Sequence, residues 1–205
     1  MSEGRRERKK AETRRALSSA ALRLAEQLGP DGVTVEAIAD AADVSARTFF
    51  NYFASKDDAI AGVAPSEASE LLTDLLDRPA DESPLEALRG MAVAAATRLE
   101  PTADELWARH RLTQRHPSLA ARRAARFTEV ERELAGEIAR RTGLDPDLDP
   151  YPALVVAAAV GALKVSLSVW QERGRPGPLV EVVDDAFAQL AAGFDLPVPV
   201  STARH

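Results

Sequence analysis

Residues 34–53 read Thr-Val-Glu-Ala-Ile-Ala-Asp-Ala-Ala-Asp-Val-Ser-Ala-Arg-Thr-Phe-Phe-Asn-Tyr-Phe, and this stretch decides the fold. Thr34 and Ser45 are residues of the kind that cap helix N-termini, and each precedes a short segment with helical periodicity, 35–42 and 46–53. Small side chains in the first segment allow close approach of the second. The pattern predicts two short helices joined by a tight turn, held by apolar side chains at Ile38, Ala39, Ala42, Val44, Phe49 and Phe53.

The outer face of the second predicted helix has the chemistry of a DNA reader. A short helix fits the major groove, where Arg pairs with guanine O6 and N7 and Asn pairs with adenine N6 and N7. The residues predicted to face the bases are Ala46, Arg47, Phe50 and Asn51. Hydroxyls and an ammonium group suited to phosphate contacts flank them at Thr34, Thr48, Tyr52 and Lys56.

The flanking sequence extends the pattern in both directions. A helix predicted over residues 6–28 has an inward stripe at Leu17, Ala21, Leu24 and Leu28, and it ends at Gly29-Pro30. Ser55 caps a further helix with Asp57 and Asp58 in its first turn. Residues 6–60 together resemble the DNA-binding domain of the TetR family of bacterial regulators. That resemblance implies base reading by the second helix of the motif and phosphate contacts from the four residues named for that role.

Two positions depart from the pattern of the family. Asp43 stands where the family usually has glycine in the turn, and Asp tolerates a left-handed backbone better than most residues. Phe50 stands where tyrosine is common, so a hydroxyl is lost and packing on a thymine methyl is the alternative. The turn is expected to survive the first departure.

Charge is distributed unevenly along the chain of 205 residues. The formal net charge is −6, yet residues 1–15 contain seven basic and three acidic side chains. Residues 1–60 are balanced, so the acidic excess lies after residue 60. A basic end on an acidic body is typical of a DNA reader with a second half of another function, although a solvated basic arm gives the same pattern.

The remainder predicts only helices, so the fold class is all-α with about nine or ten helices. Helices are expected over 66–77, 85–99, 102–115, 118–141, 152–172 and 179–194, with Leu71, Leu72, Leu75 and Leu76 inward in the first of these. We expect a helix-turn-helix domain over residues 1–54, an effector-binding and dimerisation domain over 55–195, and a tail over 196–205.

The second half also resembles a TetR subgroup, the regulators of mycofactocin systems and their actinobacterial relatives, through Trp107, His110-Arg111, Pro117 and Trp170. This resemblance implies a small apolar effector of the acyl type, with a candidate pocket at Trp107, His110 and Arg111; a core tryptophan beside surface charges is the alternative. Family members pair their last two helices with a second copy. The homodimer interface is therefore expected at Val160, Leu163, Leu167, Trp170, Val183, Phe187 and Leu190, although a monomeric core would give the same apolar pattern.

Several classes of function lack support. There is no cysteine, no phosphate loop and no nucleophile elbow, and the alternating Asp145, Asp147 and Asp149 lack the glycine and glutamate of a calcium loop. No apolar run reaches the length of a membrane span, and residues 1–15 do not form a secretion signal. We expect a cytoplasmic protein that is no enzyme and holds no metal or cofactor.

The function predicted from the sequence is a repressor. A homodimer binds a palindromic operator in double-stranded DNA, and a small-molecule effector releases it. Two alternatives stay open: an architectural DNA binder without an effector, and a helical small-molecule-binding protein with no DNA role.

Overall fold

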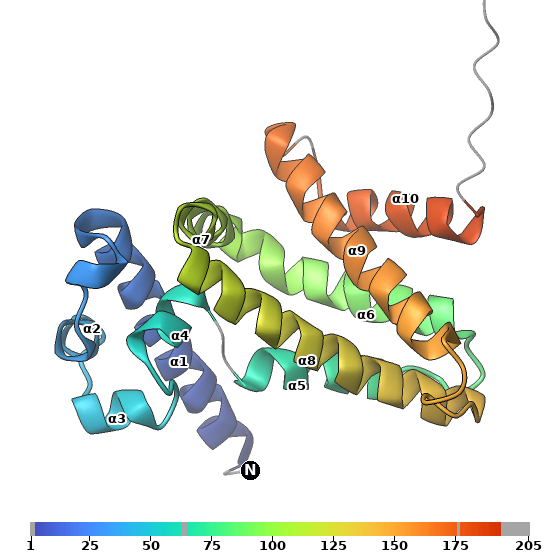
Figure 1. The fold of residues 1–205 in the computed structure, drawn as a ribbon, viewed down its shortest axis with the longest axis horizontal. Coiled ribbons are helices and arrows are strands. Elements are labelled where there is room, and N and C mark those ends of the chain that lie inside the picture. The colour runs from blue at the N-terminus through green and yellow to red at the C-terminus, as the bar shows by residue number, and fades with distance from the viewer. Residues whose placement is uncertain (1–2, 63–64, 176, 194–205) are drawn as a thin grey trace, which may run out of the picture. The chain divides into compact units, whose positions relative to one another are not determined.

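The computed structural model describes residues 3–62, 65–175 and 177–193. Within these ranges it contains helices and no strands, which confirms the all-α prediction (Figure 1). The expected tail, 196–205, lies outside the described residues. The elements in chain order are α1 Glu3–Leu28, η1 Pro30–Gly32, α2 Val35–Ala41, α3 Ala46–Phe50, α4 Lys56–Ala61, α5 Pro65–Leu76, α6 Pro84–Leu99, η2 Glu100–Thr102, α7 Ala103–Arg115, α8 Pro117–Thr142, α9 Tyr151–Glu172 and α10 Leu179–Ala191.

The chain divides into two compact units. The first contains residues 1–76 and 101–134, and the second contains 77–100 and 135–205. The predicted DNA-binding domain, 1–54, is thus only part of the first unit, which also includes α4, α5, α7 and most of α8. The functional boundary at residue 54 stays a prediction.

The first unit has α1 at its centre, packed against α2, α4 and α7. Its core contains Leu17, Ala21, Ile38 and Phe49, each fully buried. The stripe predicted on α1 is correct at Leu17 and Ala21 and half-buried at Leu24, but Leu28 is 58% exposed. Leu28 is the last residue of the helix, where the chain leaves the core at Gly29. On α5, Leu75 is buried as predicted, whereas Leu76 is exposed.

The second unit is built from α6, α9 and α10, which pack against one another. Met91, Val156, Val183 and Phe187 are among its buried side chains. After α9 the chain enters a turn: Arg175 adopts a left-handed backbone, and its N–H donates to Trp170 O at 2.9 Å. The indole N–H of Trp170 then donates to Gly177 O at 2.6 Å, which closes the turn over the ring.

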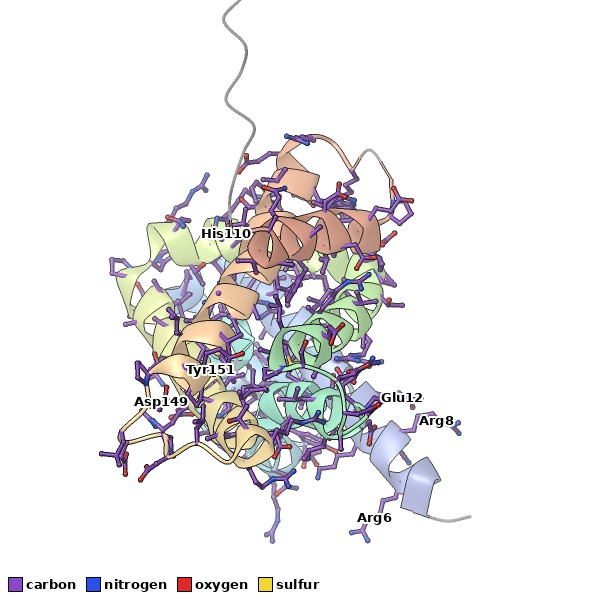
Figure 2. The ribbon with its side chains drawn as sticks, turned by 90° about the vertical axis from the view of Figure 1, so that its right-hand side faces the viewer. Arg6, Arg8, Glu12, His110, Asp149 and Tyr151 are labelled. Atoms are coloured by element: carbon purple, nitrogen blue, oxygen red, sulfur yellow. The ribbon has the colours of Figure 1, made fainter. Side chains whose placement is uncertain are left out.

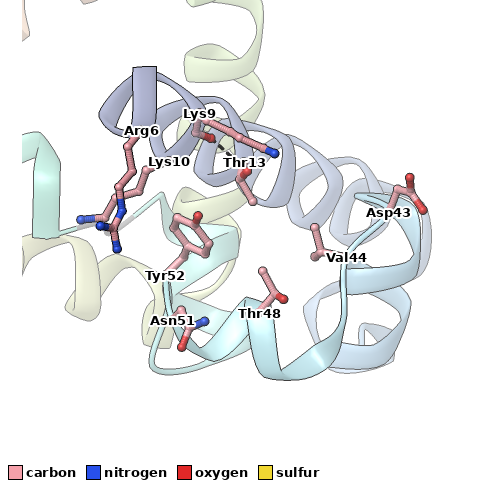
Figure 3. A pocket seen from close by; sticks show the side chains of 9 residues that line it. All are labelled: Arg6, Lys9, Lys10, Thr13, Asp43, Val44, Thr48, Asn51 and Tyr52. Carbon is pink, nitrogen blue, oxygen red and sulfur yellow. Dashed lines mark hydrogen bonds between the residues drawn. The ribbon is translucent and has the colours of Figure 1, made fainter. Parts of the chain in front are cut away.

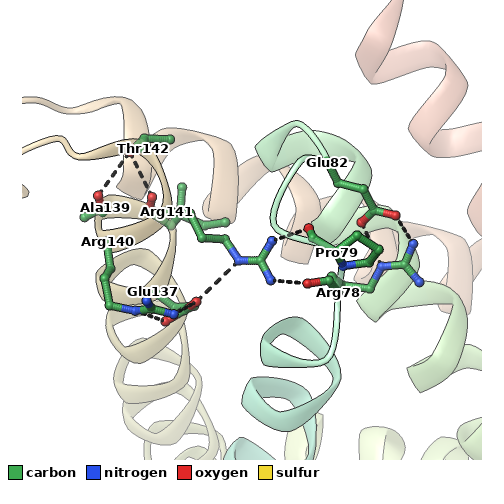
Figure 4. Close-up of polar contacts among 9 residues, drawn as sticks. Arg78, Pro79, Glu82, Glu137, Ala139, Arg140, Arg141 and Thr142 are labelled. Carbon is green, nitrogen blue, oxygen red and sulfur yellow. Dashed lines mark hydrogen bonds and ion pairs between the residues drawn. The ribbon is translucent and has the colours of Figure 1, made fainter.

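The last turns of α8 hold the loop before α6 through an arginine–glutamate cluster (Figure 4). Arg141 donates to the carbonyls of Arg78 and Pro79 at 2.9 and 3.1 Å, and it also contacts the buried carboxylate of Glu137. Arg140 bonds the same carboxylate, which raises the pKa of the Arg140 guanidinium. The cluster fixes the path of the loop that leads into α6.

Candidate nucleic-acid interface

The two helices of the motif form as the sequence predicts, with side-chain caps at both N-termini. Thr34 Oγ1 accepts from Ala37 N at 3.1 Å, and Ser45 Oγ accepts from Thr48 N at 3.1 Å. The second helix is shorter than the predicted 46–53, because α3 ends at Phe50. The chain continues in a turn in which Tyr52 N donates to Phe49 O at 2.9 Å.

The turn between α2 and α3 survives the departure from glycine. Asp43 has φ 53, the left-handed conformation that its side chain was predicted to tolerate. The next residue closes the turn, since Val44 N donates to Ala39 O at 3.0 Å. Val44 is half-buried and packs against the core of the first unit.

Two phenylalanines anchor the motif and so define which face of α3 is free. Phe49 and Phe53 are 0% and 3% exposed, with ring centroids 5.8 Å apart. Phe50, between them, is 58% exposed and touches Phe49 only edge-on. The side of α3 that carries Phe50 is therefore the free side, and the side that carries Phe49 is the packed one.

The four predicted base-reading residues are brought together on this free face. Arg47, Phe50 and Asn51 are exposed, and Ala46 is half-buried beside them. The face therefore offers a guanidinium, an aromatic ring and an amide in two successive turns, a set able to read base edges in a major groove.

The four predicted phosphate ligands are differently placed. Thr34 is exposed at its cap, and Tyr52 is half-buried. The hydroxyls of Thr48 and Ser45 are hydrogen-bonded to each other at 2.9 Å. Lys56 is turned inward: its Nζ donates to the carbonyls of Pro30, Asp31 and Val33 at 3.0, 3.3 and 2.8 Å. All three ammonium hydrogens of Lys56 thus have an acceptor in the loop between α1 and α2.

We expect Lys56→Met to weaken the fold without changing the salt dependence of DNA binding. The substitution strips the donor from carbonyls of the 30–33 loop, so the free energy of unfolding should fall by about 1–3 kcal/mol. Urea unfolding measures the stability, and fluorescence anisotropy at several salt concentrations measures the DNA slope. If the slope of log K against log salt instead fell by about 0.9 for each DNA-binding domain, Lys56 would be identified as a phosphate ligand.

An open cleft of about 570 Å³ lies between α1 and the turn–α3 segment (Figure 3). One wall carries three cationic side chains of α1, and the other carries polar side chains of the motif. Figure 3 places Asp43 at the end of the cleft away from Tyr52. The cleft is lined by Arg6, Lys9, Lys10, Thr13, Asp43, Val44, Thr48, Asn51 and Tyr52.

The candidate effector residues lie on α7 in the first unit. Trp107 is half-buried and stacks on His110, with ring centroids 5.3 Å apart. His110 and Arg111 are exposed, and Arg111 lies 3.6 Å from Glu26. Trp107 and His110 are thus brought together while Arg111 is directed to an ion pair at the surface. An effector role for the three stays a prediction.

The buried arginine of α7 is Arg109, which the sequence analysis did not single out. Its guanidinium, 6% exposed as a residue, donates to Ala59 O at 3.1 Å and to Ile60 O at 2.5 Å, at the end of α4. It also donates to Ser18 Oγ of α1 at 3.1 Å. Arg109 therefore joins three helices of the first unit by hydrogen bonds to one side chain.

The predicted dimer residues have a role inside the single chain. Five of the seven are buried in the second unit, where α9 and α10 pack on each other and on α6; these are Val160, Leu163, Trp170, Val183 and Phe187. Leu167 and Leu190 are half-buried. The apolar periodicity correctly predicted a buried face. In the single chain this face is covered by helices of the same chain.

The opposite face of α9 is exposed and apolar. Leu154 and Val165 are 68% and 59% exposed, and Ala157 is exposed between them. Although no uninterrupted apolar run is that long, α9 as a whole is long and apolar enough to cross a membrane, and 28% of its apolar window is buried. A contiguous exposed apolar face of this kind is typical of an interaction surface.

The described residues form a helical fold with a helix-turn-helix that is capped at both helices and anchored in the core. The second helix of this motif has a free face with polar and aromatic side chains. These features together are typical of DNA-binding regulators. Comparison with known families agrees. A family model described as "Bacterial regulatory proteins, tetR family" matches residues 17–61, and one described as "MftR C-terminal domain" matches residues 82–195. This chain belongs to the TetR family of transcription regulators, and it is not an enzyme.

A curated relative is a transcription regulator, and solved structures share the fold. The HTH-type transcriptional regulator TcmR of Streptomyces glaucescens is 38% identical over 176 residues, which cover 83% of this chain and 78% of that protein. FadR from Bacillus subtilis, solved with stearoyl-CoA, matches with TM-score 0.58 at 18% identity, over 87% of this chain and 97% of its own. FadR from Thermus thermophilus, solved with lauroyl-CoA, matches with TM-score 0.52 at 23% identity, over 94% and 99%.

Proposed function

We propose that this protein is an effector-released repressor that binds a near-palindromic operator as a homodimer. The observation that carries the proposal is the free face of α3, where Arg47, Phe50 and Asn51 are exposed while Phe49 and Phe53 are buried. A rigid anchor behind an exposed reading face is what sequence-specific contact in the major groove requires. The protein would act in the cytoplasm, where it binds chromosomal DNA.

The dimer is supported by the exposed apolar face of α9. Leu154, Ala157, Gly161 and Val165 recur at intervals of three and four residues, so they form one stripe along the helix. Short side chains at Ala157 and Gly161 leave room for a second helix to approach. A second copy presents the same stripe, so a two-fold axis through this face covers both at once. We assign the interface to this stripe, with Leu167 and Leu190 at its margin.

The effector proposed is a small apolar molecule of the acyl type. Support comes from the family model of residues 82–195 and from neighbours of the same fold that were solved with stearoyl-CoA and lauroyl-CoA. We call the DNA-binding domain of each protomer a head. Release requires that the effector bind more tightly to a dimer whose two heads are wrongly spaced for the operator than to a dimer in the DNA-bound conformation.

The test is fluorescence anisotropy with duplexes tiled across the DNA that flanks the gene of this protein. We expect tight binding to one palindromic duplex. Arg47→Ala should weaken that binding by roughly 5- to 150-fold for each half-site, the value of one bidentate base contact. Arg23→Ala, an exposed change on α1 away from the reading face, is the control.

The two alternative functions give different results in the same assay. An architectural binder would bind all duplexes alike and would not respond to acyl-CoA. A helical small-molecule-binding protein would bind no duplex at low salt, and Arg47→Ala would change nothing. Either result would overturn the repressor proposal.

A further inference from the structure

We propose that Arg6, Lys9 and Lys10 form a phosphate clamp that holds the DNA backbone against the recognition segment. The inference deepens the proposed function and rests on it. The three cations line the cleft of Figure 3 from α1, and Thr48, Asn51 and Tyr52 line it from the motif. Because Asn51 belongs both to the reading face and to the cleft, a duplex read by α3 brings its backbone to the same opening.

The three cations are available for a ligand. Arg6, Lys9 and Lys10 are exposed, and within the described part of the chain none of them has an ion pair. By contrast Arg8, on the same helix, lies 3.9 Å from Glu12 and does not line the cleft. Figure 2 shows Arg6 and Arg8 leaving α1 on different sides. Helical geometry therefore separates the clamp cations from the rest of the basic segment.

The clamp adds positive charge beside α3, where the ammonium of Lys56 is engaged within the chain. The ammonium of Lys56 is fully bonded to three backbone carbonyls, so the motif itself presents few free cations around α3. DNA-binding proteins obtain much of their affinity from Lys and Arg that neutralise phosphates. In this chain the α1 side of the cleft is where exposed cations and motif hydroxyls meet.

Asp43 adds a negative charge to the residues that line the cleft. Asp43 lines the same cleft as the three cations, at the end away from Tyr52, and is exposed. A phosphate in the cleft is attracted by the cations and repelled by this carboxylate. Asn has the same shape and also tolerates the left-handed backbone of φ 53, so Asp43→Asn removes the charge while it keeps the turn.

The experiment measures the salt dependence of binding to a random-sequence duplex of about 30 base pairs, from about 50 to 200 mM KCl. The clamp variant is Arg6→Gln/Lys9→Gln/Lys10→Gln. The matched control, Arg8→Gln/Arg15→Gln/Arg23→Gln, removes three exposed cations of the same helix outside the cleft. Each cation that touches a phosphate contributes about 0.9 to the slope of log K against log salt.

We expect the clamp variant to lower the slope by about 2.7 for each bound head and the control to lower it by less than about 1. Asp43→Asn should raise the affinity several-fold, and Asp40→Asn, an exposed acid outside the cleft, should not. Circular dichroism confirms that these surface variants stay folded.

Equal slopes for the clamp variant and its control would overturn the clamp while leaving the repressor proposal intact, provided that Arg47→Ala still weakens operator binding. Equal effects of Asp43→Asn and Asp40→Asn would overturn it as well. No binding by the unaltered protein at low salt would instead overturn the proposed function itself.

Discussion

Arg109→Met should lower the free energy of unfolding by about 2–4 kcal/mol, the largest loss expected from any single charged side chain of the first unit. Methionine fills much of the same volume but donates no hydrogen bond. The carbonyls of Ala59 and Ile60 would lose their charged donor, and Ser18 would lose its partner. Buried acceptors left without a donor cost about 1–3 kcal/mol each. Urea unfolding followed by circular dichroism measures the change.

Arg111→Met is the matched control, two residues along the same helix. Its guanidinium is half-exposed and 3.6 Å from Glu26, so its removal should cost less than about 1 kcal/mol. Gly62→Ala approaches the same contact from the other side: φ is +70, and a Cβ would lie 2.8 Å from Arg109 Nε. We expect it to destabilise the fold as well. Similar losses for Arg109→Met and Arg111→Met would show that the buried bonds contribute little.

Arg109 also connects α7 to the helices of the DNA-binding region. Its hydrogen bonds fasten α7 to the end of α4 and to α1, and α1 in turn packs on α2 of the motif. Arg122 adds ion pairs from α8 to Asp57 and Asp58 in the first turn of α4. Thus α7 is bonded to the predicted DNA-binding domain through Ser18, and α7 and α8 hold the two ends of α4, which follows that domain in the chain.

The sequence predicted well those features that depend on local chemistry. The caps at Thr34, Ser45 and Ser55, the left-handed Asp43 and the buried pair Phe49 and Phe53 all follow from residue type and spacing. Periodicity and capping act over a few residues, so a single chain suffices to predict them. The free face of α3 followed for the same reason.

The contacts that the sequence did not predict all join distant segments. Lys56 was predicted to contact phosphate from its chemistry and position, and the sequence did not show that its ammonium contacts carbonyls 23–26 residues away in the chain. Arg109 bonds to carbonyls 49 and 50 residues away. A charged side chain on a helix is expected to face solvent, and no local signal tells when a tertiary acceptor turns it inward.

The assignment of the dimer face had a related difficulty. Both faces of α9 are apolar, so periodicity alone does not say which face packs on α6 and α10 and which is left for a partner. Val160, Leu163 and Trp170 form the first kind of face, and Leu154, Gly161 and Val165 form the second. Only the packing of the single chain separates the two.

Leu154→Glu/Val165→Glu should convert the dimer to monomers and reduce operator affinity by about 10²- to 10⁴-fold. Each substitution places a carboxylate on the exposed stripe of α9, and a two-fold axis would bring it close to its copy in the partner. The single chain should stay folded, because both side chains are already more than half exposed. A monomer carries one reading head, so it loses the gain in effective concentration that linked half-sites provide.

Sedimentation velocity and operator anisotropy together check this prediction. Leu148→Glu is the control, since Leu148 is 83% exposed but lies in the loop before α9. It should leave both the mass and the affinity unchanged. The double variant should still bind random duplexes weakly, because the clamp cations and α3 of each head are untouched. A double variant that sediments as a dimer would show that the stripe is not the interface, and the two chains would then have to meet through another surface.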